Sequence, residues 1–180
     1  MKMIPSDHFV RFYNEVFKFL DEKEGLKPYY HEISRHQELH CLEMFRKGGL
    51  QGIYEYYQRI RHEENCVLSI KFEEGKMTSF MERCPSLSKV LDNDAEPCVK
   101  YCDHCAGWSI PLYTKCGIYY VQNMVGRDIP SCVSVRTPDR EIALKAKEEF
   151  LAAGVPAELI NTNLDNWEEV EKNKMKSGEK

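Results

Sequence analysis

Residues 66–85 read CVLSIKFEEGKMTSFMERCP, and this stretch decides the fold class. Side chains in its first part alternate between two faces with a period of two, which is typical of a half-buried strand. One face carries Cys66, Leu68, Ile70 and Phe72. The acidic, glycine-containing segment 73–76 predicts a turn, and residues 77–83 predict the returning strand of a β-hairpin. Cys84-Pro85 ends that strand.

Helical periodicity dominates before the hairpin, and a mixture of helices and strands follows it. Apolar residues at three- and four-residue spacing predict three helices within the first 64 residues. After the hairpin we expect a helix from Glu96 to Ile110, ended by Pro111, then strands over 118–122 and 131–136 and a helix after Asp139. Strands in antiparallel pairs, rather than alternating with helices, favour an α+β fold. We therefore expect N-terminal helices packed on a small antiparallel sheet, with a cysteine-bearing helix. Residues 1–160 form one domain in this interpretation, and residues 161–180 form a charged tail.

Composition and charge exclude several classes of function. The 180 residues are 42% hydrophobic and 30% charged, with a formal net charge of −4 and no long basic run, so a nucleic-acid partner is not expected. The longest uncharged run, residues 116–126, is too short to span a membrane. Asp7 and Glu15 interrupt the apolar residues near the start, which argues against a signal peptide and for a cytoplasmic location.

Residues 84–105 contain four of the eight cysteines. Thiolates bind zinc and the iron of iron–sulfur clusters, and Cys102-x-x-Cys105 has a common chelating spacing that Cys98 and Cys84 could complete. If residues 98–105 are one helix, however, Cys98 and Cys105 lie about 10 Å apart along its axis, too far to share one zinc ion. Three alternatives remain: the helix begins after Cys98, only neighbouring cysteines bind, or the thiols react or simply pack.

His36 and His40 are spaced four residues apart on one face of a predicted helix, as in two-histidine metal sites. The intervening letters, HQELH, do not match the metalloprotease motif. Imidazole could instead be the base that activates a cysteine, and hydrogen-bonded packing is the alternative. His104 is expected to be exposed and Cys132 to pack inertly in its strand.

The order of these features resembles the L-2-amino-thiazoline-4-carboxylic acid hydrolase-like family. The features are initial helices, a hairpin ending in Cys84-Pro85, the cysteine-bearing segment YCDHC at 101–105 and a final strand SCVSV at 131–135. The resemblance spans roughly residues 30–137. It implies that water opens a small cyclic C=N substrate.

Two hypotheses follow from different classes of function. In the first, the chain is a small-molecule hydrolase acting on carbon–nitrogen bonds, with Cys102 as nucleophile or metal ligand and His36 or His40 as the proton-transfer group. In the second, it is a non-catalytic zinc- or small-ligand-binding protein with a structural cluster of Cys84, Cys98, Cys102 and Cys105. The aromatic faces of the first and third predicted helices offer more apolar surface than a small sheet can cover, so a homodimer is a further expectation.

Overall fold

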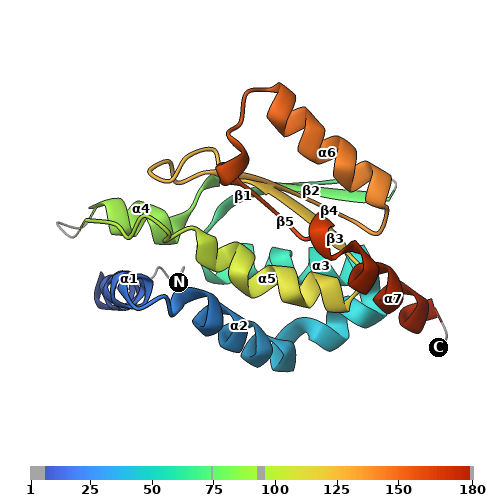
Figure 1. Ribbon diagram of the computed structural model, residues 1–180, viewed down its shortest axis with the longest axis horizontal. Coiled ribbons are helices and arrows are strands. Elements are labelled where there is room, and N and C mark those ends of the chain that lie inside the picture. The colour runs from blue at the N-terminus through green and yellow to red at the C-terminus, as the bar shows by residue number, and fades with distance from the viewer. Residues whose placement is uncertain (1–6, 74, 93–95, 179–180) are drawn as a thin grey trace.

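A five-stranded antiparallel sheet lies between helical layers in the computed structural model, which describes residues 7–73, 75–92 and 96–178 (Figure 1). The longer helices are α1 (Asp7–Glu22), α2 (Leu26–Gln37), α3 (Glu43–Glu63), α4 (Pro85–Asp92), α5 (Asp103–Lys115), α6 (Arg140–Ala152) and α7 (Trp167–Gly178). Short helical turns are the π-helix η1 (Glu38–Leu42) and the 3₁₀ turns η2 (Ala157–Leu159) and η3 (Leu164–Asn166). The strands are β1 (Val67–Glu73), β2 (Lys76–Arg83), β3 (Tyr119–Asn123), β4 (Cys132–Thr137) and β5 (Ile160–Thr162).

The strand order is β1-β2-β4-β3-β5, and every neighbouring pair is antiparallel. β1 and β2 form the expected hairpin, in which Glu73 pairs with Lys76. Gly75 in the turn has φ of +71°, a conformation that favours glycine because it has no side chain. The α+β class, with N-terminal helices on a small antiparallel sheet, is confirmed.

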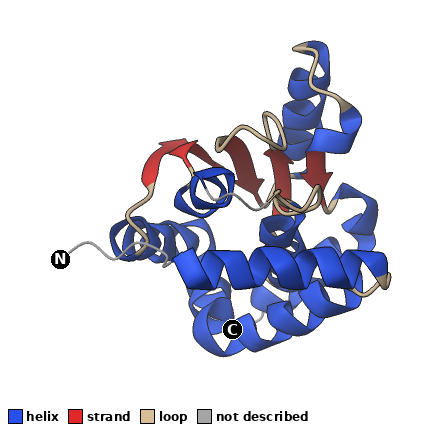
Figure 2. Ribbon diagram, turned by 90° about the vertical axis from the view of Figure 1, so that its left-hand side faces the viewer, coloured by secondary structure: helices blue, strands red, loops and turns tan. Residues whose placement is uncertain are grey.

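Both faces of the sheet are covered by helices. On one face Met77 and Tyr120 pack with residues of η1, α3 and α5, including Phe45 and Tyr113. On the other face the neighbouring Tyr119 packs with residues of α6, η3 and α7. Figure 2 shows the same layering, with α6 at the top and the strands between it and the helices below. A polar side chain on either face of the central strands β3 and β4 is therefore directed into the protein.

The cysteine-bearing helix begins later and ends later than its sequence predicts. α5 starts at Asp103, so the helix begins after Cys98, and it continues through Pro111 to Lys115. The preceding segment forms turns, in which the Tyr101 N–H donates to the Cys98 carbonyl at 2.9 Å. Asn14 on α1 accepts from the Cys98 N–H at 2.8 Å. This hydrogen bond gives the Cys98 N–H, which lies outside the helix, a partner 84 residues away in the sequence.

Three further expectations about the elements are corrected. The sequence predicts no element between the end of the hairpin at Pro85 and Glu96, but helix α4 lies there and buries Leu87 and Val90. The segment after residue 160 is no tail in its described part: β5 pairs with β3, and α7 buries Val170 completely. The apolar spacing that predicts the first helix also predicts a buried face, but on α1 this face is only partly buried, because Phe12 is 63% exposed whereas Phe17 is buried. Residues 179 and 180 of the predicted tail lie outside the described residues.

Candidate active site

A cavity of about 230 Å³ lies between the inner face of the sheet and helices α3 and α5. Strand alternation positions its polar lining, because residues two apart on a strand point to the same face. Thus β4 directs Cys132, Ser134 and Arg136 into the cavity, while β2 contributes Ser79 and β3 contributes Gln122. The helices contribute mostly apolar surface, namely Phe45, Tyr56, Tyr57, Ile60, Trp108, Leu112 and Tyr113.

Arg136 lies at the wall of this cavity and is only 2% exposed. Its guanidinium donates three hydrogen bonds to hydroxyl groups. Nε donates to Tyr113 at 2.9 Å, and the two terminal nitrogens donate to Ser79 at 2.8 Å and to Tyr57 at 2.9 Å. The guanidinium carbon also lies 4.4 Å from the ring centre of Tyr57 and 5.2 Å from that of Tyr120. Neutral hydroxyls and aromatic rings thus hold the cation in place.

No carboxylate neutralises Arg136 in the described part of the chain. None of the ion pairs among the described residues includes it, and its electrostatic neighbours are Tyr57, Tyr113 and Tyr120. Burial lowers the pKa of the guanidinium, but the tyrosines raise it more, so the net shift is upward and the charge persists. A buried, unpaired charge costs several kcal/mol. The cavity therefore presents a fixed positive charge to whatever fills it.

The hydroxyl groups around Arg136 are themselves paired. Ser79 and Ser134 lie 3.0 Å apart, and Tyr57 and Tyr113 also lie 3.0 Å apart. Burial raises the pKa of Tyr113 well above its usual value, so this phenol stays neutral. The result is a polar end of neutral donors and acceptors around one cation, facing an otherwise apolar cavity.

Four cysteines lie together beside the cavity. Cys84, Cys102, Cys105 and Cys132 border a smaller cavity of about 40 Å³, and Cys105 and Cys132 also border the larger one. All four are free thiols. Burial raises the pKa of Cys84 and Cys105 to about 11 and that of Cys132 to about 12, and it raises that of Cys102 further. At neutral pH these side chains are protonated.

The predicted four-cysteine metal site is corrected by this arrangement. Cys98 does not border the small cavity, and it is buried in a cluster with residues of α1, α2 and α4 against which Cys84 and Cys102 also pack. Among the described residues, which include all eight cysteines, no group of three or more His, Cys, Asp or Glu side chains is placed to hold a metal ion. The structure therefore brings together Cys84, Cys102 and Cys105, adds Cys132, and gives no support to zinc or an iron–sulfur cluster at this place.

The structure does not bring His36 and His40 to the cysteines. Both are exposed, and neither borders the cavities, whereas Gln37 and Cys41 of the same helical segment do border the larger one. The helix therefore turns its histidine face away from the cavity. The proton-transfer role predicted for these two histidines has no geometric support.

The histidine that lies beside a cysteine is His104, which the sequence predicted to be exposed. It is buried, and its Nε2 lies 3.3 Å from the Cys105 sulfur. Its Nδ1 bonds to the Tyr101 carbonyl oxygen, which can only accept. Burial lowers the pKa of His104 to about 4, although the bond to Tyr101 raises it. The imidazole is thus neutral, with its proton on Nδ1.

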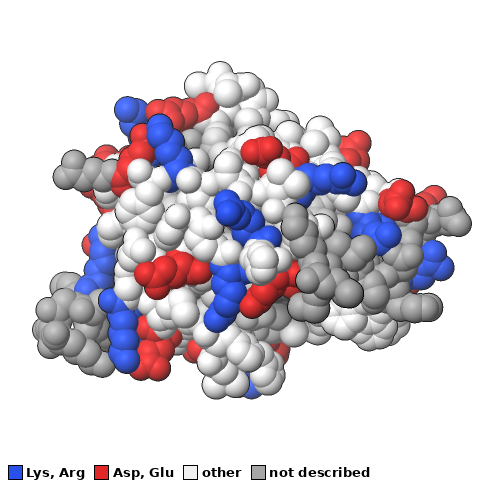
Figure 3. Space-filling model, turned by 180° about the vertical axis from the view of Figure 1, so that it is seen from behind, with Lys and Arg blue, Asp and Glu red and all other residues white. Residues whose placement is uncertain are grey.

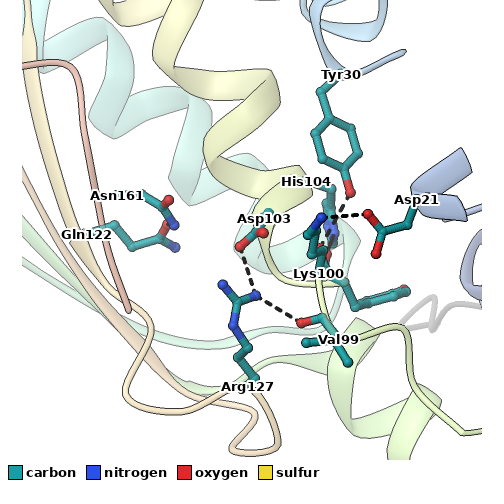
Figure 4. A network of polar contacts seen from close by, with 10 residues as sticks. Asp21, Tyr30, Val99, Lys100, Asp103, His104, Gln122, Arg127 and Asn161 are labelled. Carbon is teal, nitrogen blue, oxygen red and sulfur yellow. Dashed lines mark hydrogen bonds and ion pairs between the residues drawn. The ribbon is translucent and has the colours of Figure 1, made fainter. Parts of the chain in front are cut away.

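A network of ion pairs holds the start of α5, where His104 and Cys105 lie (Figure 4). Arg127 donates to Asp103 at 3.0 Å and to the Val99 carbonyl at 2.9 Å. On the other side, Lys100 bonds to Asp21 of α1 at 2.6 Å. Loop 124–131 and helix α1 therefore fix the turn that precedes the helix, and Asp103 places a negative charge in its first turn, which favours the helix dipole.

The charged side chains on the protein surface are distributed differently from the single buried charge of Arg136. On the face seen in Figure 3, acidic and basic side chains are interspersed around uncharged surface. Mixed charges produce little long-range field in salt solution. Among the described residues on this face, no cluster of one charge competes with the buried Arg136 for an anionic ligand. Across the described residues, no helix combines the length and the apolar character that crossing a membrane demands.

Sequence reasoning missed Arg136, Ser79 and Tyr113, and it assigned Cys132 to inert packing. One signal was available, since residues 132–136 read CVSVR and place a polar or thiol side chain at every second position. Such alternation usually marks a solvent-facing side. Here both faces are covered, so the same pattern lines a cavity.

Comparison with models of known protein families, with curated proteins and with solved structures finds no match to this chain. Function is therefore argued from the site.

Proposed function

We propose that the protein is a small-molecule hydrolase-like protein that binds a compact, carboxylate-bearing ring compound and opens a carbon–nitrogen bond in it. The observation that carries this proposal is the buried, unpaired guanidinium of Arg136 in the wall of a largely apolar cavity. Ligand sites of this kind combine apolar walls with a few polar groups that fix orientation. A ligand carboxylate would supply the missing counter-charge.

The hydrogen bonds of Arg136 leave room for an anion. Of the five N–H donors of an arginine, three bond to Tyr113, Ser79 and Tyr57, which leaves two without a partner among the described residues. These two are on different terminal nitrogens, one on each. Guanidinium and carboxylate groups match each other in pairs of parallel hydrogen bonds. Arg136 is therefore equipped to bind one further, planar anion.

The size of the cavity limits the ligand. An engineered protein cavity of about 150 Å³ binds benzene. A cavity of about 230 Å³ therefore suits one ring with a carboxylate and a few further atoms. This range includes small heterocyclic acids, as the family resemblance implies. The free thiols, with Cys102 among them, supply candidate nucleophiles, and they support a reducing, cytoplasmic setting.

The binding part of the proposal is tested with 3-phenylpropanoate and its neutral isostere 3-phenylpropanamide, by isothermal titration calorimetry at one fixed salt concentration. Losing one partner of a buried, hydrogen-bonded charge pair costs about 2–5 kcal/mol, so the carboxylate should bind at least about 30-fold more tightly. Arg136→Gln should abolish the difference. Equal affinities of the wild-type chain for both probes would refute a carboxylate site.

A non-catalytic ligand-binding protein is the second candidate, and the raised pKa values of the thiols favour it, since thiols are weak nucleophiles. The two candidates differ in turnover. Incubation with 2-aminothiazoline-4-carboxylate, followed by mass spectrometry, should show addition of one water if the protein is a hydrolase. Binding of this compound without any product would leave the ligand-binding function alone.

A further inference from the structure

The hydrogen bonds of His104 define which of its nitrogens can accept a proton. The Tyr101 carbonyl oxygen accepts a hydrogen bond from Nδ1–H, so the proton of the neutral ring is on Nδ1 and Nε2 carries a lone pair. Cys105 Sγ lies 3.3 Å from that nitrogen and is its hydrogen-bond partner. The thiol therefore donates to Nε2. This is the geometry in which an imidazole removes the proton of a nucleophile.

Packing holds the imidazole in this orientation. Its ring centre lies 4.7 Å from that of Trp108, 5.1 Å from that of Tyr101 and 5.5 Å from that of Phe17. A side chain enclosed by three aromatic rings cannot change rotamer without moving them. The acceptor nitrogen thus stays directed at Cys105.

Cys105 is also the most accessible thiol. It alone of the eight cysteines is exposed, and it borders both cavities. Cys41 instead donates to the Gln37 carbonyl at 3.3 Å, and Cys84 accepts from the Leu87 N–H at 3.5 Å. Among the described residues, no second cysteine bonds to an imidazole. Cys105 is therefore the thiol that is both accessible to a ligand and hydrogen-bonded to an imidazole.

We propose that Cys105 is the nucleophile and His104 its general base in hydrolysis of a cyclic amide or amidine bond of the ligand whose carboxylate Arg136 binds. This assignment rests on the proposed function and replaces Cys102 and the surface histidines in it. Cys105 and Arg136 border the same cavity, on α5 and β4 respectively. One ligand can therefore contact both.

The reaction balances with water alone. Sγ bonds to the sp² carbon while its proton moves to Nε2. The ring C–N bond then breaks, its electron pair stays on nitrogen, and Nε2 returns the proton to that nitrogen, which leaves a thioester or thioimidate on Cys105. Water gives a proton to Nε2 and its oxygen bonds to the carbon. The C–S bond breaks, and Sγ recovers the proton.

The resting pair is neutral rather than an ion pair. Cys105 reaches the surface, but the protein packed around its sulfur raises the thiol pKa to about 11, and burial lowers the pKa of His104 to about 4, so little thiolate exists at neutral pH. The proton must move as the new bond forms, which is general-base catalysis. Its rate should depend little on pH between those two values, whereas a thiolate reaction below the thiol pKa changes tenfold for each pH unit.

The test uses an electrophile with a carboxylate at one end and a bromoacetyl group at the other, 3-(2-bromoacetamido)propanoate, with its neutral amide as control. Alkylation of the full chain is mapped to individual cysteines by mass spectrometry between pH 6 and 8. In the wild-type chain, Cys105 should react first, with a rate that changes less than threefold over this range. In His104→Asn the amide can still donate to Tyr101, but no base is left beside the thiol. The alkylation rate of Cys105 in this variant should therefore rise about 100-fold between pH 6 and pH 8. His36→Asn, at an exposed histidine, should behave as wild type.

The outcomes separate the two proposals. Earlier labelling of Cys84, Cys102 or Cys132, or a wild-type Cys105 rate rising tenfold per pH unit, would overturn the role of the pair. The wild-type pH profile decides this even if His104→Asn fails to fold. Equal rates with the acid and the amide, in a chain whose Cys105 profile is flat, would instead reject the carboxylate site and keep the pair.

Discussion

Replacing Arg136 with methionine tests whether this arginine serves the ligand or the fold. Methionine keeps most of the apolar stem and removes the buried charge. The three hydroxyl partners of the guanidinium are left with other bonds, because Tyr57 pairs with Tyr113 and Ser79 with Ser134. No buried hydroxyl therefore loses all of its partners.

The expected change in unfolding free energy is small because two large contributions oppose each other. Three hydrogen bonds from a charged group contribute about 1.5–3 kcal/mol each, and the aromatic contacts add about 1–2 kcal/mol. Against these stands the desolvation of an unpaired ion, which is several kcal/mol, and hydrophobic replacement of buried charges is often neutral or stabilising. We expect Arg136→Met without ligand to lie within about 2 kcal/mol of wild type.

The ligand should then separate the variants. At a concentration 100 times its Kd, a carboxylate stabilises the folded state by about 2.7 kcal/mol. Urea unfolding followed by tryptophan fluorescence, with and without 3-phenylpropanoate, should show this gain in wild type and none in Arg136→Met. Arg35→Met, at an exposed arginine on α2, is the control and should respond as wild type. A loss above about 3 kcal/mol for Arg136→Met without ligand, or an undiminished ligand effect, would show that Arg136 is structural.

Three further predictions concern the fold around the site. His104 has a folded pKa near 4, below its usual 6.5, so the unfolded chain binds its proton first. Stability should fall by up to about 3 kcal/mol as pH drops from 6.5 to 4, and His104→Asn should lose this part of the urea-midpoint profile. Gly107→Ala should cost about 1–3 kcal/mol, because a Cβ there would lie 2.7 Å from the Tyr30 ring, whereas Gly48→Ala meets no atom within 4 Å and should cost less than about 0.5 kcal/mol in the same urea titration. If the exposed aromatic face of α1 joins two chains in a homodimer, Phe12→Ser should shift the molecular mass measured by light scattering to that of one chain; a mass that is the same for both proteins would contradict it.

The sequence predicted the elements whose side-chain pattern repeats within a short segment, and it missed those that depend on contacts distant in the sequence. The hairpin follows from alternation and a glycine turn within 18 residues, and β1 and β2 have that pairing. The start of α5 could not be predicted in this way, because the Cys98 N–H bonds to Asn14, which lies 84 residues earlier in the chain. Helix α7 was missed for a similar reason. Its charged sequence has few apolar residues, but Val170 is buried against the sheet layer.

The candidate site was predicted in part. Spacing brought attention to Cys84, Cys102 and Cys105, which do lie around one cavity. The base was sought at a helical i, i+4 pair, whereas the histidine beside a thiol is its immediate neighbour, His104. Adjacent residues on an ideal helix point about 100° apart, so sequence alone disfavours such a contact. It forms here because both residues lie in the first turn of α5, where the chain enters from a tight turn.

The position of Arg136 and of the cysteines along β4 predicts how long a reactive ligand must be. Cys132 and Arg136 lie four residues apart on this strand, about 13 Å between Cα atoms. Cys132 borders both cavities together with Cys105, so the nucleophile on α5 lies near the start of β4, whereas the anchor Arg136 lies near its end. Bromoacetyl derivatives of glycine, β-alanine and longer ω-amino acids should therefore alkylate Cys105 at rates that pass through a maximum with chain length. Members shorter than the distance between the Arg136 guanidinium and Cys105 Sγ should react slowly, and long ones exceed a cavity of about 230 Å³. Rates measured by mass spectrometry that only rise with length would reflect apolar affinity alone, and the same order in Arg136→Gln would show that the carboxylate does not set the position of the ligand.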